Sequence, residues 1–217
     1  MTKNAVDVRN LSVAYGSHVV LRDFSLAVGV GEAVLLQGPS GCGKSTLFHA
    51  VCGLIPGSIS AEISGEILLS GKNVRQLGAH ERAREIGIVF QNPDTQLFCD
   101  TVEDEIAFGL ENLCIPRVEI GSRIDEILTL TRMEGYRFAS PKELSGGQKQ
   151  LVVLAAVLAL GPKILLLDEA LSQLDKGGRQ ALTERLFALR RKGCTLLMAD
   201  HGGELASIAS RVVNWEV

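Results

Sequence analysis

The chain has 217 residues, a mass of 23.3 kDa and a formal net charge of −3, from 22 Lys and Arg against 25 Asp and Glu. This balance excludes the strongly basic composition of a nucleic-acid-binding domain, so we expect no nucleic-acid partner. A hydrophobic share of 46% excludes a disordered chain and suits one globular domain with a sizeable core.

The longest apolar run, 151–160, has about half of the ~20 residues that a membrane span requires. The N-terminus has no secretory signal pattern. Five cysteines are present without a CxxC spacing, which indicates free thiols rather than disulfides or a zinc site. We therefore expect a soluble cytosolic protein.

Short apolar runs alternate with helix-length segments along the chain. Two alternating runs, 6–13 and 19–28, flank a Gly-Ser turn and predict an antiparallel strand pair. Further strands are predicted at 33–37, 62–69, 86–90, 164–167, 195–199 and 212–215. Helices are predicted at 43–54, 101–134 with a break at Pro116, 145–160, 176–192 and 204–209. Strands alternating with helices predict an α/β fold with a mostly parallel central sheet, in which the helical block 92–145 is an insertion.

A glycine-rich segment follows the predicted strand 33–37 and precedes a predicted helix. Residues 38–45 read GPSGCGKS, which matches the phosphate-binding pattern GxxxxGK[ST] in its required context. Glycines let backbone N–H groups converge on one point, and the helix N-terminus adds further donors. The lysine would reach the β- and γ-phosphates, the serine hydroxyl would ligate Mg²⁺, and Cys42 would offer only its backbone N–H. The candidate nucleotide-binding residues are Gly38, Pro39, Ser40, Gly41, Cys42, Gly43, Lys44, Ser45 and Thr46.

Two carboxylates stand at the end of the predicted strand 164–167. Ligands bind at the carboxyl ends of strands in parallel sheets, so Asp168 and Glu169 are candidates for the same site. Asp168 suits the hold on Mg²⁺, and Glu169 can orient and deprotonate an attacking water, a division of labour that phosphoryl transfer requires. An Asp-Glu pair after a strand is often only a solvated turn, and the phosphate loop decides against that interpretation.

The segment 144–148 reads LSGGQ and is the most specific feature of the chain. Ser145 is a good N-cap, and Gly146 and Gly147 leave the helix N-terminus open to an anion. We therefore count Ser145, Gly146, Gly147 and Gln148 as nucleotide-binding candidates. The helix that follows is apolar all round, which predicts that it is buried.

With these motifs in this order, the whole chain resembles the nucleotide-binding domain of ATP-binding cassette (ABC) proteins, a P-loop NTPase fold. The resemblance implies one ABC ATPase domain over 1–217, which binds ATP and Mg²⁺ and hydrolyses ATP. It makes Gln91 a contact of Mg²⁺ or the water, His201 the γ-phosphate switch, Tyr15 the adenine-stacking aromatic and 172–175 the D-loop. It also implies a head-to-tail dimer with a second ABC ATPase subunit, identical or a sister chain, with ATP between the phosphate loop of one and the signature of the other.

A narrower resemblance lies in 91–98 and 101–112, QNPDTQLF and TVEDEIAFGLEN, which are similar to ATPases of energy-coupling-factor (cobalt-type) importers. In that family this segment lies in the helical subdomain, next to the groove that receives a coupling helix of the transmembrane component. The resemblance implies a subunit peripheral on the inner face of the cell membrane that couples hydrolysis to uptake of a metal ion or vitamin. A soluble or regulatory ABC ATPase not coupled to transport is the alternative. Leu151, Ala170 and Gln173 depart from common family residues, without touching a phosphate-binding position.

Overall fold

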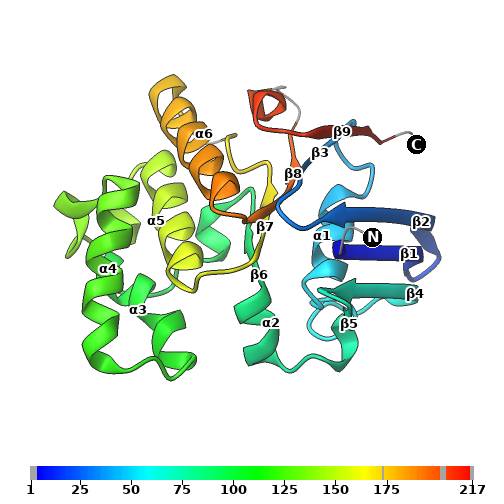
Figure 1. The fold of residues 1–217 in the computed structure, drawn as a ribbon, viewed down its shortest axis with the longest axis horizontal. Helices are drawn as coiled ribbons and strands as arrows, with labels where there is room; N and C mark the ends of the chain where they lie inside the picture. The colour runs from blue at the N-terminus through cyan, green and yellow to red at the C-terminus, as the bar shows by residue number, and fades with distance from the viewer. Residues whose placement is uncertain (1–3, 173, 201–203, 216–217) are drawn as a thin grey trace.

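The computed structural model describes residues 4–172, 174–200 and 204–215. Two sheets lie side by side, with an antiparallel sheet at the right of Figure 1, a parallel sheet in the middle and the helices α3, α4 and α5 at the left. Within the described ranges, no helix is both long and apolar enough to span a bilayer.

The parallel sheet carries the ends of the motif-bearing strands. Its strand order is β6-β7-β8-β3-β9, and each neighbouring pair is parallel. The strands are β3 (Ala33–Gln37), β6 (Ile86–Val89), β7 (Ile164–Asp168), β8 (Thr195–Ala199) and β9 (Arg211–Asn214). Every residue of β7 and β8 is buried, which explains why both strands are nearly uninterrupted apolar runs.

Helices cover both faces of this sheet. They are α1 (Lys44–Val51), α2 (Ala79–Glu85), α3 (Val102–Asn112), α4 (Arg117–Thr131), α5 (Gly146–Ala159) and α6 (Lys176–Arg191). Short 3-10 turns lie at η1 (Val74–Gln76), η2 (Pro93–Thr95), η3 (Glu134–Tyr136), η4 (Pro141–Glu143) and η5 (Glu204–Ser207). The chain leaves the sheet after β6, runs through α3 and α4, and returns along α5 (Figure 1).

Alternate residues of the central strands enter two different cores. On β3, Ala33 and Leu35 pack with α3, α4, α5 and α6, while Val34 and Leu36 pack with α1 and the antiparallel sheet. The same alternation holds on β7 and follows from the two-residue repeat of a strand. The sheet is therefore fixed between two apolar layers, and its carboxyl edge is a rigid platform.

The antiparallel sheet flanks α1. Its strand order is β2-β1-β4-β5, built from β1 (Asn4–Tyr15), β2 (His18–Gly29), β4 (Glu62–Leu69) and β5 (Lys72–Asn73). Tyr15 pairs with His18 across the predicted Gly-Ser turn. Because β2 packs on the phosphate loop through Leu21, this sheet takes part in shaping the site.

A bulge bends β1 against β4. Arg9 and Ser12 of β1 pair with residues only two apart on β4, so β1 carries one extra residue there. Asn10 in the bulge has φ 48°, and its N–H donates to Ser25 Oγ at 2.9 Å. Gly65 lies opposite with φ +89°, and a Cβ there would lie 2.4 Å from Asn10 O, so only glycine fits.

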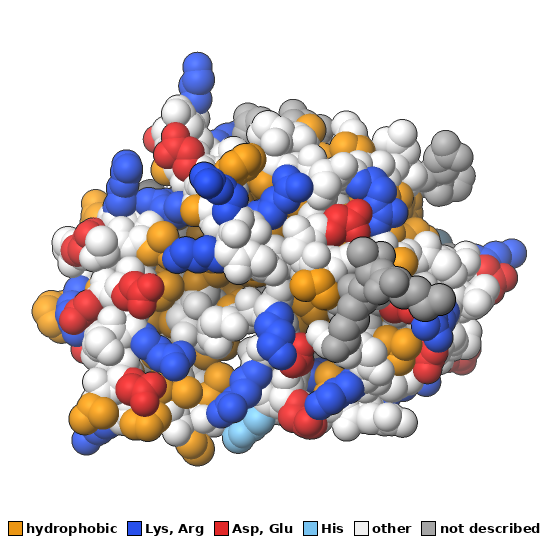
Figure 2. All heavy atoms as spheres, in the orientation of Figure 1, with side chains coloured by type: hydrophobic (Ala, Val, Ile, Leu, Met, Phe, Trp, Pro, Cys, Tyr) orange, Lys and Arg blue, Asp and Glu red, His pale blue; other side chains and the backbone are white. Residues whose placement is uncertain are grey.

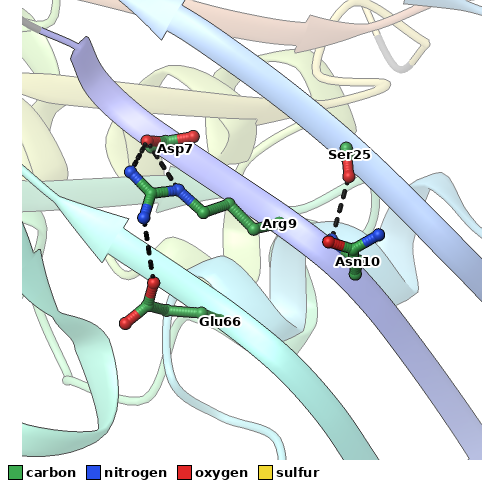
Figure 3. A network of polar contacts seen from close by, with 5 residues as sticks. All are labelled: Asp7, Arg9, Asn10, Ser25 and Glu66. Atoms are coloured by element: carbon green, nitrogen blue, oxygen red, sulfur yellow. Dashed lines mark hydrogen bonds and ion pairs between the residues drawn. The ribbon is translucent and has the colours of Figure 1, made fainter.

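An ion pair closes over the bulge. Figure 3 shows the Arg9 guanidinium between two carboxylates, Asp7 on its own strand at 2.6 Å and Glu66 on β4 at 3.2 Å. The Arg9 side chain is more than half exposed, so solvent screens this pair and it contributes little to stability. It links β1 to β4 across the bulge.

The predicted strands and helices are present, and Pro116 separates α3 from α4 as expected. Two elements were missed. The seven residues of α2 have no buried member and therefore no apolar periodicity to predict a helix. The two-residue β5 is too short to show a pattern. All five cysteines are free thiols, in agreement with the prediction.

Candidate nucleotide-binding and catalytic site

The phosphate loop joins β3 to α1 over residues 38–43. Gly41 and Gly43 have φ of 77° and 105°, values in the left-handed region that favours glycine. Gly43 also has no room for a side chain, because a Cβ there would lie 2.8 Å from Leu21 Cδ2. At Gly38 a Cβ would lie 2.6 Å from Trp215 Cβ. The loop is thus held between β2 and the end of the chain's last strand, in a shape that requires its glycines.

Lys44 begins α1 and points into the loop. Its side chain is buried, with 4% exposure, and its Nζ donates to Gly38 O at 2.9 Å and Pro39 O at 2.8 Å. Cys42 Sγ lies 3.5 Å from the same nitrogen. The loop carbonyls thus hold a positive charge at the centre of its curve, next to the N-terminus of α1, which favours anions.

Asp168 ends β7 beside the loop. It is 5% exposed and bonded to the Ser45 side chain. Burial and the neighbouring Glu169 charge raise its pKa, while the bond with Ser45 and the charges of His49 and Lys44 act in the opposite direction. A hydroxyl and a carboxylate side by side are the oxygen ligands that Mg²⁺ takes, with the nucleotide's phosphates supplying others. The residues present therefore fit a Mg²⁺ ion.

Glu169 follows Asp168 and faces the phosphate loop. Its φ of 51° is unusual for a residue with a side chain, and its backbone N–H donates to Ala199 O at 3.0 Å. A cavity of about 210 Å³ lies between its side chain and the loop, lined by Val20, Gly41, Gly43, Lys44, Ser45, Thr46 and Glu169. Left-handed backbone thus turns this carboxylate out of the buried strand toward the loop.

Gln91 reaches the same carboxylate from another element. It lies two residues beyond the end of β6, and its Nε2 donates to Glu169 Oε2 at 2.8 Å. The two residues are 78 positions apart in the sequence, and the pairing of β6 with β7 brings them together. The structure thus joins three predicted motifs: the loop, the acidic strand end and Gln91.

The signature forms the N-terminus of α5. Ser145 Oγ accepts the N–H of Gln148, and Gln148 Oε1 accepts the N–H of Ser145, a reciprocal capping box. Ser145 and Gly146 are exposed. The Gln148 side chain, predicted to contact nucleotide, is engaged in this cap. Among the described residues that line the cavity at Lys44, none belongs to the signature.

One predicted residue lies apart from this group of side chains. Tyr15 lies half-buried at the end of β1 and packs with the core below the antiparallel sheet. His201 lies outside the described residues, as does Gln173 of the predicted D-loop.

Sequence reasoning missed three residues that lie around the site. His49 on α1 stacks edge-on against Phe90 at 5.4 Å, and burial lowers the pKa of its imidazole against the opposing charge of Asp168. Gln96 and Gln150 both bond to the backbone of Phe90. Only Gln96 stands inside a quoted motif segment, 91–98, and the partners of all three become neighbours only in the folded chain.

Comparison with known proteins identifies the family. The family model described as ABC transporter matches residues 21–172. A protein of Methanosarcina mazei, whose name assigns it provisionally to the ABC transporter ATP-binding proteins, is 43% identical over 96% of this chain. This chain spans only 36% of that relative's length. The energy-coupling factor transporter ATP-binding protein EcfA1 of Leuconostoc mesenteroides is 40% identical over 96% of this chain and 76% of its own length.

Solved structures agree. CbiO1 of Clostridium perfringens, described as part of the ABC transporter complex cbiONQ, has a TM-score of 0.83 and 31% identity, covering 98% of this chain and 84% of its own. The ATP-binding cassette MJ0796, described as a dimeric post-hydrolysis state bound to ADP and Pi, has a TM-score of 0.85 and 26% identity, covering 96% and 93%. The geometry of the site and these similarities lead to one conclusion: the chain belongs to the ABC transporter family and has the P-loop NTPase fold of its ATP-binding cassettes.

Proposed function

We propose that this chain hydrolyses ATP as the motor subunit of an energy-coupling-factor-type ABC importer. The observation that carries the proposal is the bond from Gln91 to Glu169, whose side chain lines the cavity at Lys44. It joins a side chain that can sense the nucleotide to a carboxylate that can act as base, next to a loop built for phosphates.

In this proposal the chain's own residues divide the work. Backbone N–H groups of 38–46 and the Lys44 ammonium bind the phosphates, and Ser45 and Asp168 hold Mg²⁺. The bound metal would supply charge neutralisation at the transferring phosphoryl group. Glu169 accepts a proton from the attacking water, and Gln91 orients that water after its bond to Glu169 is given up. Tyr15 stacks on the adenine, and His201 contacts the γ-phosphate.

A second subunit completes the site. The signature residues 145–148 lie at an exposed helix N-terminus and do not line the cavity at Lys44, so the anion site they form suits the nucleotide of another chain. A head-to-tail pair with two-fold symmetry places each signature over its partner's loop. We propose this dimer, with an identical or a sister subunit, as the active form. Nucleotide-driven closure and opening of the pair drive transport.

The segment after Gln91 is the proposed contact with a transmembrane component. Phe98 and Phe108 are 62% and 46% exposed and pack edge to face at 4.6 Å. Buried Glu105 accepts the backbone N–H groups of Phe98 and Cys99, which fixes the segment on α3. An ordered, exposed aromatic pair is typical of a protein interface. Hydrophobic side chains also reach the surface over α3 and α4 in Figure 2.

Docking there would hold the chain at the inner face of the cell membrane, and 92–145 would act as the helical part of a single ATPase domain. The cargo, a metal ion or a vitamin, would be chosen by the membrane component.

The test is ATP turnover of the purified chain as a function of its own concentration, with Glu169→Gln as control. Composite sites predict that the rate per chain rises with concentration. Loss of the carboxylate base predicts a fall of about 100-fold or more in the control, at unchanged ATP affinity. Normal turnover in Glu169→Gln would remove Glu169 from the role of base. A rate per chain that does not depend on concentration would argue against self-pairing.

A further inference from the structure

The backbone of Phe90 is held on both sides by glutamine side chains. Phe90 N–H donates to Gln96 Oε1 at 2.7 Å, and Gln150 Nε2 donates to Phe90 O at 3.0 Å. Gln96 Nε2 also donates to Ile88 O at 3.1 Å. The pairing of β6 with β7 ends at Val89, so Phe90 lies one residue beyond the last ladder position. Two glutamine side chains thus bond to the backbone of Phe90, where the pairing with β7 has ended, immediately before Gln91.

The burial of Gln150 indicates that this residue serves to make the hydrogen bond to Phe90 O. Gln150 lies on α5, five residues after the N-cap Ser145, and is 1% exposed. Its Oε1 has no hydrogen-bond partner within the described part of the chain. A buried amide with one half unpaired is costly compared with an apolar side chain of the same size. The reverse amide orientation would turn Oε1 toward Phe90 O, so the orientation with Nε2 as donor is fixed.

These bonds form a continuous path from the signature helix to the base. Gln150 moves with α5, its bond fixes Phe90, and the next residue is Gln91, whose Nε2 holds Glu169. A second tie runs beside it, because Lys149 Nζ pairs with Asp94 at 2.7 Å. That aspartate is largely exposed, which leaves the buried bond of Gln150 as the better-fixed connection.

We infer that Gln150 is a positioning residue that transmits the position of the signature helix to Gln91 through the backbone of Phe90, which Gln96 holds from the other side. Together the two glutamines set whether Gln91 holds Glu169 or turns to the water. The inference deepens the proposed function and rests on the roles given there to Gln91 and Glu169. Neither glutamine touches a reacting atom. Their effect reaches catalysis only through the backbone of Phe90.

The experiment is a double-mutant cycle on turnover with Gln150→Met and Gln91→Ala. Gln150→Met keeps the length of the side chain and removes the donor to Phe90 O. We expect kcat to fall about tenfold or more, since small misplacements of a catalytic group have effects of this size, while the ATP dissociation constant changes less than about twofold. In the Gln91→Ala background, Gln150→Met should produce no further fall in kcat.

The control is Thr131→Val on α4, where a fully buried hydroxyl donates to Ile127 O at 2.8 Å. It also removes one buried hydrogen bond, but far from Phe90 in the sequence. We expect it to lower the midpoint of thermal unfolding and to leave kcat unchanged well below that midpoint. A purely structural role of Gln150 would make the two variants behave alike, which would overturn the inference.

Three further outcomes are decisive. Multiplicative effects of Gln150→Met and Gln91→Ala would show that Gln150 does not act through Gln91. If Gln150→Met does not fold, Gln96→Met, at a half-buried position on the other side of Phe90, should give the same non-additive pattern, and additivity there overturns the inference. If Glu169→Gln loses turnover while Gln150→Met keeps a normal kcat, the positioning role is refuted and the proposed base stands. Normal turnover in Glu169→Gln instead refutes the proposed base.

Discussion

At the scale of single residues, hydrogen bonds hold two reactive groups in place. Lys44 bonds to the carbonyls of its own loop, and Glu169 bonds to Gln91. In the proposed function, a nucleotide that enters the loop would take over the donors of Lys44, and turnover would require Gln91 to release Glu169. Both exchanges are local, and each can be tested by a single substitution.

Lys44→Ala removes the ammonium from the phosphate site. We expect ATP affinity to fall about 10- to 100-fold, the equivalent of one charge-assisted hydrogen bond. The chain's single tryptophan reports binding, because Trp215 stacks on Phe24 at 4.5 Å and lies against Gly38 of the loop. Lys72→Ala, on exposed β5, is the matched control and should bind normally. Equal affinity in both variants would contradict the assignment of the loop.

Asp168→Asn separates stability from activity. Burial raises the pKa of Asp168. Between the pKa of the unfolded chain and this raised pKa, the folded chain binds a proton that the unfolded chain has lost. The contribution of Asp168 to stability therefore falls as the pH rises through this range. At neutral pH we expect the amide to raise the free energy of unfolding by roughly 0.5–2 kcal/mol and to abolish Mg²⁺-dependent turnover. Thermal unfolding and turnover with and without Mg²⁺ measure the two effects. A less stable variant with normal turnover would argue against the role of Asp168 at the metal.

At the scale of elements, strand ends and helix starts position the described groups of the site. β3 and β7 deliver the loop and the two carboxylates to the same edge, and α1 and α5 each begin at a glycine-rich turn. Arg137, the residue after η3, pairs with Glu103 on α3 and with Asp125 on α4 and so links the two helices of the helical segment. That unit carries the exposed aromatic pair.

The double change Phe98→Ser with Phe108→Ser tests the proposed docking surface. We expect unchanged ATP affinity and loss of association with membranes that contain the transmembrane component, because the exposed rings are the apolar anchors of the contact. The control is Phe187→Ser on α6, a phenylalanine that is also 46% exposed. Flotation of the chain with such membranes is the measurement. Equal retention of the double variant and the control would contradict the surface.

At the scale of the whole molecule, the proposed phosphate loop and the signature occupy different places, since no described signature residue lines the cavity at Lys44. The loop and Glu169 share a cavity, while the signature caps α5 elsewhere. Both signs of charge are interspersed on the face shown in Figure 2, which gives no single-sign field to repel an identical partner there.

Complementation tests the head-to-tail pairing. Lys44→Ala disables the loop, and Ser145→Arg disables the exposed signature, so each variant alone should be inactive. A mixed pair has one site in which both halves are intact. Random mixing at equal amounts makes half of the pairs mixed, with one of two sites working, so we expect about a quarter of the wild-type rate. No recovery at any ratio would argue against composite sites.

The fold class, the phosphate loop, the acidic strand end and the signature can all be predicted from the sequence, because each is a local pattern whose chemistry depends on neighbours in the chain. The uninterrupted apolar run of β7 predicts a buried parallel strand. The glycines of 38–45 and the flanking strand and helix predict the phosphate loop. Tertiary structure alone decided which of these groups meet. Strand pairing brings Gln91 to Glu169 across 78 positions, and packing of α5 brings Gln150 to Phe90 across 60. Such contacts join residues from separate elements, and no periodicity or spacing along the chain encodes them.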